Sequence, residues 1–284
     1  MSQIGLWFDG GGRFGFGNIC RSAEMARELA SRGHDVFSVP LSGKAKSLSP
    51  YRAADRGRVD VVLLDVPYCG GEEVIRARAL GAKVIALDYE GDEAPDVVVS
   101  LQDGRRMPIQ TRRHVGVEFA IIRSELRAAK GAVSKSGDVL VLVGGGNSEG
   151  LSNEIASRLH EVSLCVVQGP NAGTLQPERK NIRVLQNPSR LPELMSGCRW
   201  AVTSGGTTML EMLYFGKAIH VVPRTAAETK FAQGFLRKGA LLGMGLEKLR
   251  EPAEDQIFSC ERRGPELIDG CGAQRIAQII EGFL

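Results

Sequence analysis

The sequence alternates between short apolar runs and amphipathic stretches along most of its length. Two of the apolar runs, Ile4–Phe8 and Asp138–Val143, are each followed by a glycine-rich segment and then by a stretch whose apolar residues recur with helical spacing. Strands that alternate with helices in this way build a parallel sheet covered by helices on both faces. The chain is therefore predicted to have an α/β fold.

The pattern runs through the chain twice. In the first round, strands are expected at 4–8, 35–39, 60–64, 83–87 and 96–100, with helices at 19–32 and 71–80. The stretch over 130–136 is small and polar, which is typical of a linker. We therefore predict an amino-terminal domain over 1–132 and a carboxyl-terminal domain over 137–284.

The second round repeats the same arrangement. Strands are expected at 138–143, 163–168, 182–186, 200–203 and 218–222, and helices at 152–162, 190–196, 207–215, 226–238 and 273–283. Each round has the form of a Rossmann-like layer, in which loops at the carboxyl ends of the strands hold ligands. The sequence predicts two Rossmann-like domains whose glycine-rich loops face each other across a cleft.

Composition narrows the classes of partner. The chain has 36 Lys and Arg against 33 Asp and Glu, a net charge of +3, without the basic excess typical of nucleic-acid binding. No apolar run approaches the roughly 18 residues of a membrane-spanning helix, and no basic-then-apolar leader opens the sequence. The six cysteines include no Cys-x-x-Cys pair that would indicate a disulfide framework or a zinc site. We expect a cytoplasmic protein with small-molecule partners, no nucleic acid, no membrane insertion and no cofactor.

The first glycine-rich loop runs from Asp9 to Gly17 and leads into a helix at Asn18. Its glycines allow the backbone to approach a ligand closely, and the helix amino terminus offers free N–H groups. It lacks the Gly-Lys-Ser/Thr ending of a Walker loop. The alternative is a tight strand-to-helix turn without a ligand, in which Asp9 caps the loop.

The second loop, over 144–150, opens the second round in the same manner. Gly145 lets the backbone approach a ligand, and Asn147 and Ser148 offer side-chain hydrogen bonds. The alternative is a capped helix start, because Ser152 is a good N-cap residue.

The third loop, Ser204-Gly-Gly-Thr-Thr208, lies between an apolar strand and a helix. Its hydroxyls and amides are suited to hold a diphosphate at the helix amino terminus. Glu211 follows about one turn along the helix, where a carboxylate can accept both hydroxyls of a ribose. The alternative for Glu211 is a solvated helix residue.

Several segments of the chain occur together in a familiar order. They are Asp9, Gly15-Phe-Gly-Asn-Ile-Cys-Arg21, Val115-Gly-Val-Glu-Phe-Ala-Ile-Ile-Arg-Ser-Glu-Leu126, Ser204-Gly-Gly-Thr-Thr-Met-Leu-Glu211 and Ile268-Asp-Gly-Cys-Gly-Ala-Gln-Arg-Ile276. In these segments the chain resembles the nucleotide-sugar hydrolases of pseudaminic acid biosynthesis and the related spore-coat polysaccharide proteins. Those families look like MurG-type glycosyltransferases of the GT-B fold.

The resemblance implies an enzyme that hydrolyses or transfers the sugar of a nucleotide-activated donor, a UDP-sugar, without a metal. It implies a role in surface-polysaccharide or amino-sugar biosynthesis. The nucleotide would bind mainly to the second domain, and the sugar would face the loop of the first. The residues expected at the nucleotide are Ser204, Gly205, Gly206, Thr207, Thr208 and Glu211.

The chain departs from this family at one position of the first loop. The family has histidine in a Gly-x-Gly-His motif, where this sequence has Asn18. Asparagine can hydrogen-bond an oxygen but cannot act as a general base near neutral pH. Asp9 and Asn18 are thus the predicted catalytic residues, with Gly15, Gly17 and Arg21 predicted to contact substrate. The alternative is a nucleotide-sugar-binding protein with impaired catalysis.

Overall fold

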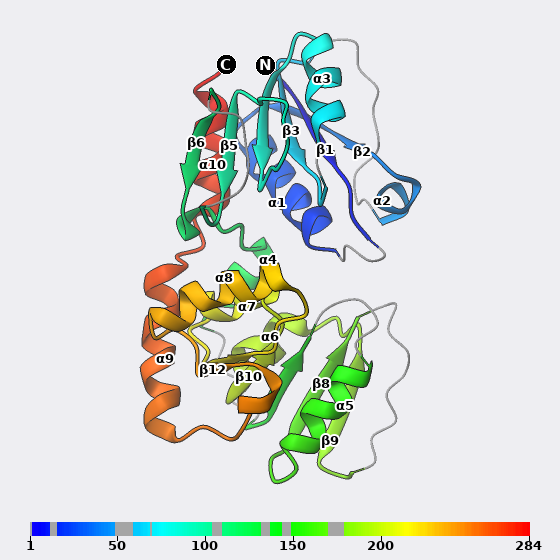
Figure 1. Cartoon of the computed structure of the whole chain (residues 1–284). Coiled ribbons are helices and arrows are strands. Elements are labelled where there is room, and N and C mark those ends of the chain that lie inside the picture. The colour runs from blue at the N-terminus through cyan, green and yellow to red at the C-terminus, as the bar shows by residue number, and fades with distance from the viewer. Residues whose placement is uncertain are drawn as a thin grey trace. The chain divides into compact units, whose positions relative to one another are not determined.

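The computed structural model describes residues 2–11, 16–48, 59–68, 70–103, 110–131, 137–143, 149–169 and 179–284. Within these residues the chain forms two compact units. Unit 1 comprises Met1–Arg123 with Gly270–Leu284, and unit 2 comprises Ser124–Asp269. Each unit is built on its own parallel sheet (Figure 1), which confirms the predicted α/β class.

The sheet of unit 1 has six strands in the order β2-β1-β3-β4-β5-β6. They are β1 (Gln3–Phe8), β2 (Asp35–Pro40), β3 (Val61–Asp65), β4 (Lys83–Leu87), β5 (Val97–Ser100) and β6 (Arg112–Val115). All neighbouring strands pair in parallel. The strand order reverses direction between β1 and β3, so that pair marks a topological switch point.

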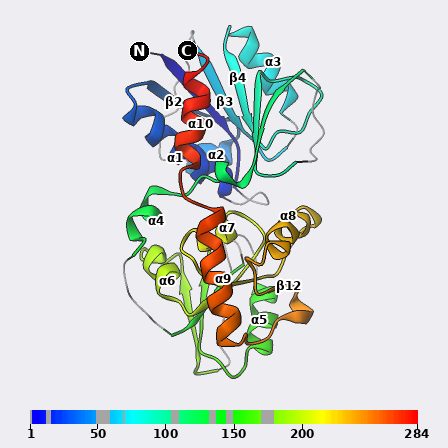
Figure 2. The ribbon, with the colours of Figure 1, turned by 90° about the vertical axis from the view of Figure 1, so that its left-hand side faces the viewer.

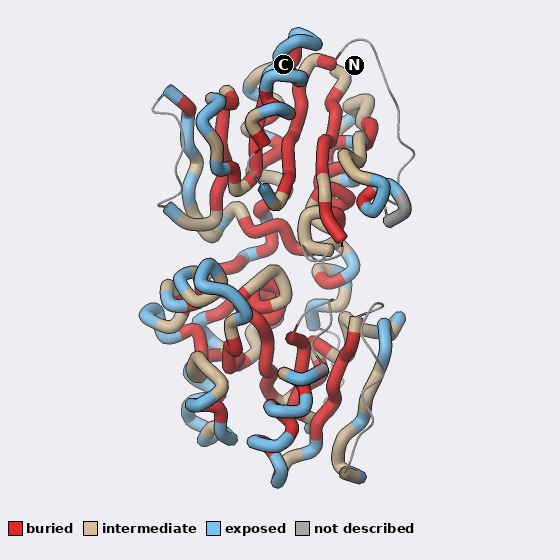
Figure 3. The backbone as a smooth tube through the Cα atoms, turned by 45° about the vertical axis from the view of Figure 1, so that its right-hand side comes forward, coloured by how far each residue is buried: buried red, intermediate tan, exposed pale blue. Residues whose placement is uncertain are grey.

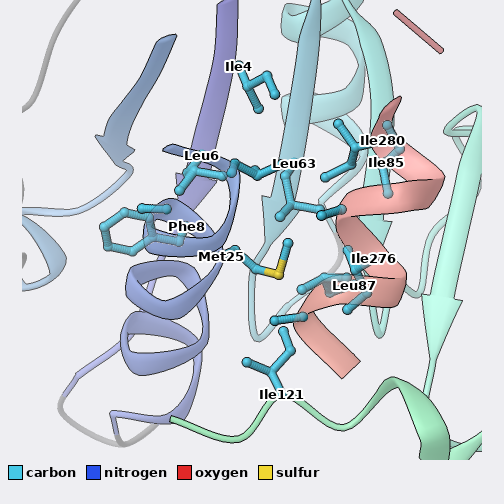
Figure 4. Close-up of a cluster of buried hydrophobic side chains, with 14 of the residues drawn as sticks. Ile4, Leu6, Phe8, Met25, Leu63, Ile85, Leu87, Ile121, Ile276 and Ile280 are labelled. Atoms are coloured by element: carbon cyan, nitrogen blue, oxygen red, sulfur yellow. The ribbon is translucent and has the colours of Figure 1, made fainter. Parts of the chain in front are cut away.

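Helices cover both faces of this sheet. On one face α1 (Gly17–Ser31) and α10 (Gly272–Glu281) pack against β1, β3, β4 and β5. Figure 4 shows this core, in which Met25 of α1 and Ile276 of α10 meet side chains such as Leu63. On the other face α3 (Gly71–Ala79) packs through Val74 and Ala77. The short helix α2 (Gly43–Leu48) follows β2.

The closing helix α10 belongs to unit 1, whereas the sequence analysis places residues up to 284 in the second domain. Its stripe of Ala273, Ile276, Ala277 and Ile280 is fully or almost fully buried in the unit 1 core. Figures 1 and 2 show α10 from different sides, and in both views it lies beside α1. The helical spacing of apolar residues predicts that α10 has a buried face, but it does not indicate which of the two sheets this face packs against.

The sheet of unit 2 has six strands in the order β12-β11-β10-β7-β8-β9, again all parallel. They are β7 (Val139–Leu142), β8 (Leu164–Gln168), β9 (Ile182–Gln186), β10 (Trp200–Thr203), β11 (Ile219–Val221) and β12 (Gly243–Met244). This is the strand order of the dinucleotide-binding Rossmann sheet, with its switch point between β7 and β10.

The helices of unit 2 are α4 (Ser124–Ala129), α5 (Glu149–Arg158), α6 (Leu191–Gly197), α7 (Thr207–Tyr214), α8 (Ala226–Arg237) and α9 (Glu254–Leu267). Its core joins α5 and α9 to the central strands around the fully buried Trp200. Figure 3 shows that the central strands of both units are buried along most of their length.

The sequence analysis misses several elements that the structure contains. Strand β6 is polar, with the sequence Arg-Arg-His-Val at the sheet edge, and β12 has only two residues. The helix α9 follows Pro252 and contains Pro265, and prolines in a sequence usually indicate a loop. Of the predicted linker over 130–136, residues 132–136 lie outside the described residues.

Gly264 tests the packing of α9 against α7. A Cβ atom at Gly264 would lie 2.5 Å from the backbone oxygen of Leu213, whereas one at Gly234 of α8 would meet nothing within 4 Å. We therefore predict that Gly264→Ala lowers the free energy of unfolding by about 1–3 kcal/mol, through overpacking. Gly234→Ala should raise it by roughly 0.5–1 kcal/mol, the helix propensity difference. Urea denaturation measures both, and equal effects would contradict this account of the α7–α9 contact.

Candidate functional site

Two loops follow strands at the switch points of the two sheets. In unit 1, Asp9 follows β1 and Asp65 ends β3, the pair of strands at which the strand order reverses. In unit 2, Ser204 follows β10, which pairs with β7. Ligands of open parallel sheets bind outside the carboxyl ends of strands at such points. The topology therefore singles out one candidate edge on each unit.

The edge of unit 1 is acidic. Asp9, Asp65 and Asp88 follow or end three neighbouring strands, β1, β3 and β4. Asp65 is fully buried, and Asp88 has a positive φ of 49°. A non-glycine residue in this region of backbone space is uncommon and marks a site that the surrounding structure holds in place.

Arg21 of α1 connects two of these carboxylates. Its Nη2 and Nε atoms donate to Asp65 at 2.5 and 3.1 Å, and its Nη1 atom donates to Asp88 at 2.7 Å. Burial alone would lower the pKa of Arg21, but the charges of the two carboxylates outweigh burial and raise it. The guanidinium is thus a fixed, charged link across the edge of the sheet.

Asn18 also binds Asp65, through an Nδ2 hydrogen bond of 2.7 Å to Oδ1. The amide is therefore held by the same buried carboxylate as Arg21. Burial raises the pKa of Asp65, while the charge of Arg21 opposes that shift. The structure brings the predicted residues Asn18 and Arg21 together, and it adds Asp65 as their common partner.

Asp9 has a different set of partners. Its Oδ1 atom accepts hydrogen bonds from the Ser42 hydroxyl at 2.5 Å and from the Gly10 amide at 2.7 Å. The Tyr68 phenol hydrogen-bonds to the carboxylates of Asp9 and Glu73, and burial together with these charges raises the pKa of Tyr68. Asp9 is half-buried and, unlike Asp65 and Asp88, forms no ion pair with Arg21.

The charge of this edge favours a particular kind of ligand group. Among the described residues, Asp9, Asp65 and Asp88 supply three carboxylates and Arg21 supplies one guanidinium, which is already paired. A phosphate would meet net repulsion here, whereas hydroxyl groups can donate to carboxylate oxygens. The edge of unit 1 is therefore suited to a neutral, hydroxyl-bearing group.

The edge of unit 2 has the opposite character. Gly206 is the N-cap of α7 and has an extended backbone, and no side chain caps the helix. The first amides of a helix that lacks a cap point outward and carry partial positive charge. Gly206, Thr207 and Thr208 are all partly exposed. The start of α7 therefore offers amide and hydroxyl donors to an anion.

Glu211 lies on the same face of α7 as Thr207 and Thr208, because residues three and four positions apart share a face. It is only 4% exposed, which contradicts the alternative of a solvated helix residue. Its position one turn from the uncapped start of α7 makes Glu211 a candidate for a binding residue.

Gly205 packs closely against α8. A Cβ atom there would lie 2.8 Å from the backbone oxygen of Glu228, so only glycine fits. The Oε2 atom of Glu228 accepts from the amides of Arg224 at 2.7 Å and of Gly205 at 3.3 Å. One amide of the loop is therefore already bound to a carboxylate, and an anion would bind nearer to Gly206 and Thr207.

The remaining predictions have mixed outcomes. Gly17 is the first residue of α1. Gly15, Gly145 and Asn147 lie outside the described residues. Sequence reasoning misses Asp65, which directly follows the strand predicted at 60–64, and Glu228, which lies within a predicted helix. The signal available for Asp65 is its position at the carboxyl end of a buried strand.

Two further features concern ions and membranes. Among the residues that the structure describes, no group of three or more His, Cys, Asp or Glu side chains is placed to hold a metal ion. None of the helices in that part of the chain has the length and apolar character needed to cross a bilayer. Metal independence stays a prediction.

No protein-family model matches the sequence, and no curated protein matches it. Solved structures do match the fold. MurG from Acinetobacter baumannii aligns with a TM-score of 0.67 at 14% identity over 99% of this chain and 100% of that one. MnaA from S. aureus, solved with UDP, aligns with a TM-score of 0.64 at 10% identity over 99% and 96%. The UDP-GlcNAc 2-epimerase of Methanocaldococcus jannaschii, solved with UDP-GlcNAc and UDP, aligns with a TM-score of 0.55 at 10% identity over 98% and 99%.

These similarities establish the fold. The chain has the GT-B fold of MurG, with two Rossmann-like domains, as the sequence analysis predicts. The narrower resemblance to nucleotide-sugar hydrolases stays a prediction.

Asp65 tests the network at the edge of unit 1. We predict that Asp65→Asn lowers the free energy of unfolding by about 1–3 kcal/mol, because it removes one of the two carboxylates that balance the Arg21 guanidinium and leaves Asp88 as its remaining ion-pair partner. The control is Asp103→Asn, which removes an exposed carboxylate paired with Arg113 in the same unit and should change little. Urea denaturation measures both variants, and a small effect of Asp65→Asn would show that the pair contributes little.

Proposed function

We propose that the protein binds a UDP-sugar and transfers its sugar to an acceptor or to water, without a metal ion. The observation that carries this proposal is the uncapped start of α7 with a buried glutamate one turn along it, at the switch point of a GT-B sheet. The proposed pathway is the synthesis of a surface polysaccharide or an amino sugar.

In this proposal the diphosphate lies against the start of α7. The amides and hydroxyls of Thr207 and Thr208 donate to phosphate oxygens, and the helix dipole favours their negative charge. Gly206 leaves room for the phosphate, since the nearest atoms to a Cβ there would be 3.8 Å away or more. These donors also stabilise the charge that develops on the leaving diphosphate when the bond to the sugar breaks.

Glu211 is proposed to accept the two hydroxyls of the ribose. Hydroxyl groups at this carboxylate would donate directed, charge-assisted hydrogen bonds to it. UDP is present in two of the structurally similar proteins, MnaA and the M. jannaschii epimerase, which supports a uridine nucleotide here.

The carboxylate of Glu228 helps to orient the ligand. It binds the amides of Gly205 and Arg224, and its negative charge repels a phosphate. A hydroxyl-bearing group beside it would instead donate hydrogen bonds. We infer that the phosphates lie nearer to Thr207 than to Glu228.

The chemistry of the first unit is proposed to depend on Asp9. Asp9 is half-buried and carries no ion pair with Arg21, so it can accept a proton from water or from an acceptor hydroxyl. Asn18 cannot take that role, but its Oδ1 atom can accept a hydrogen bond while its Nδ2 atom binds Asp65. Asp65 and Arg21 position Asn18.

The second candidate function is a binding protein that keeps the nucleotide site without catalysis. The observation that favours it is the asparagine at position 18, where the resembling hydrolases have a histidine. Titration calorimetry with UDP, followed by product analysis with UDP-sugars with and without acceptors, separates the two. Nucleotide binding without any turnover supports the binding protein.

Glu211 tests the nucleotide site. We predict that Glu211→Gln weakens UDP binding by about 1–3 kcal/mol, because the charged acceptor of the ribose hydroxyls is lost. Thr207→Val should weaken binding as well, whereas Glu161→Gln, at an exposed position of the same unit, should not. Calorimetry measures the affinities, and circular dichroism checks that each variant folds. Wild-type affinity in Glu211→Gln would refute this site.

Asn18 tests the catalytic role of the first loop. In Asn18→His, we predict faster release of sugar from the UDP-sugar, because Asp65 can orient the new imidazole as the carboxylate of a catalytic triad does. The gain should vanish in the double variant Asn18→His, Asp65→Asn, whereas Asn18→Ala should show no gain. A rate equal to that of the native chain, with UDP binding intact, would place the reaction away from this loop.

A further inference from the structure

A cavity of about 110 Å³ lies in unit 2 beside the last two strands of the sheet, β11 and β12. It is lined by His220 of β11, Leu242, Gly243 of β12, Lys248, Arg250, Pro252 and Gln256 of α9. None of these residues belongs to the loop from Ser204 to Thr208. Because a water needs only about 10–15 Å³ of such space, the cavity has room for a small ion.

His220 presents one ring nitrogen to this cavity. The residue is 3% exposed, and its Nε2 atom lies 2.8 Å from the backbone oxygen of Gly245. A carbonyl oxygen only accepts, so Nε2 carries the proton. The opposite ring edge, Nδ1 with Cε1, lies 2.9 Å from where a Cβ of Gly243 would be. Gly243 therefore lies against this edge of the ring, where a larger residue would clash with it.

Two cations line the same cavity. Lys248 and Arg250 are exposed, and neither forms an ion pair with a carboxylate among the residues that the structure describes. The neighbouring carboxylates Glu251 and Glu254 both bind Arg199 instead. The charge of Glu247 raises the pKa of His220 and so opposes part of the lowering caused by burial. The cations therefore outnumber the carboxylates that remain.

We propose that this cavity is a binding site for a phosphate group, with Lys248 and Arg250 holding its oxygens and a P–OH group donating to Nδ1 of His220. Cationic side chains bind phosphate oxygens through charge-assisted hydrogen bonds. A phosphate group also fits the neutral imidazole, because a phosphate monoester keeps one proton up to a pH of about 6 and in part above it. Burial lowers the pKa of His220, which favours the neutral ring.

The proton requirement separates phosphate from other anions. Sulfate has a similar size and charge but carries no proton near neutral pH, so it leaves Nδ1 without a donor. An unpaired buried acceptor costs free energy, and sulfate should therefore bind more weakly than phosphate. The site is independent of the proposed nucleotide site, since the two share no residue.

Proton NMR of the histidine rings tests the site directly, because the chain has only four histidines. The probes are inorganic phosphate, glycerol 3-phosphate and sulfate, each titrated at pH 6.5 and constant ionic strength, with His220→Gln identifying the resonance. We expect the His220 signal to shift saturably with phosphate, and Lys248→Ala to weaken the fitted affinity by about tenfold. Lys180→Ala removes an exposed charge of the same unit outside the cavity and serves as the matched control.

The outcomes are distinct. Tighter binding of glycerol 3-phosphate supports an organic phosphate ester as ligand, and equal binding supports free phosphate. The proposal fails if the His220 signal does not move, if sulfate moves it equally, or if Lys180→Ala weakens binding as much as Lys248→Ala does. Thr207→Val should leave the titration unchanged, so this result stands apart from the nucleotide site.

Discussion

Parallel strand pairing is the constraint on which both units depend. It brings the carboxyl ends of all strands of a sheet to one edge, and at the switch point two loops leave that edge in opposite directions. The central strands are largely apolar and buried, so polar groups collect where these strands end. Asp65, at the end of β3, and Ser204, directly after β10, are polar residues at these two edges.

The two edges differ in charge and therefore favour different ligand groups. The edge of unit 1 carries more carboxylates than cations and holds Arg21 within its own ion pairs. The start of α7 carries partial positive charge and no capping side chain. Each edge is thus suited to a different kind of ligand group, an anion at the start of α7 and hydroxyl groups at the edge of unit 1.

Much of this architecture could be predicted from the sequence, because buried parallel strands are continuous apolar runs. β4 and β9 occupy the predicted residues, and α1 and α7 differ from prediction by one or two residues at their ends. The strand β6 could not be predicted, since its edge position tolerates polar residues. Likewise, the role of Glu228 could not be predicted from the sequence, because Glu228 and Gly205 are 23 positions apart and only the tertiary fold brings them into contact.

The network around Asp65 holds the side chain of Asn18 in a fixed place. An amide that donates Nδ2 to a buried carboxylate has a fixed orientation, so its Oδ1 atom is held as an acceptor. A fixed acceptor can position a hydroxyl group but cannot remove its proton. Under the proposed function, proton removal would then fall to a carboxylate that is not already paired with a cation, and among the three at this edge Asp9 meets that condition. Asn18 would position the hydroxyl group, whether of an acceptor or of water, and Asp9 would take its proton.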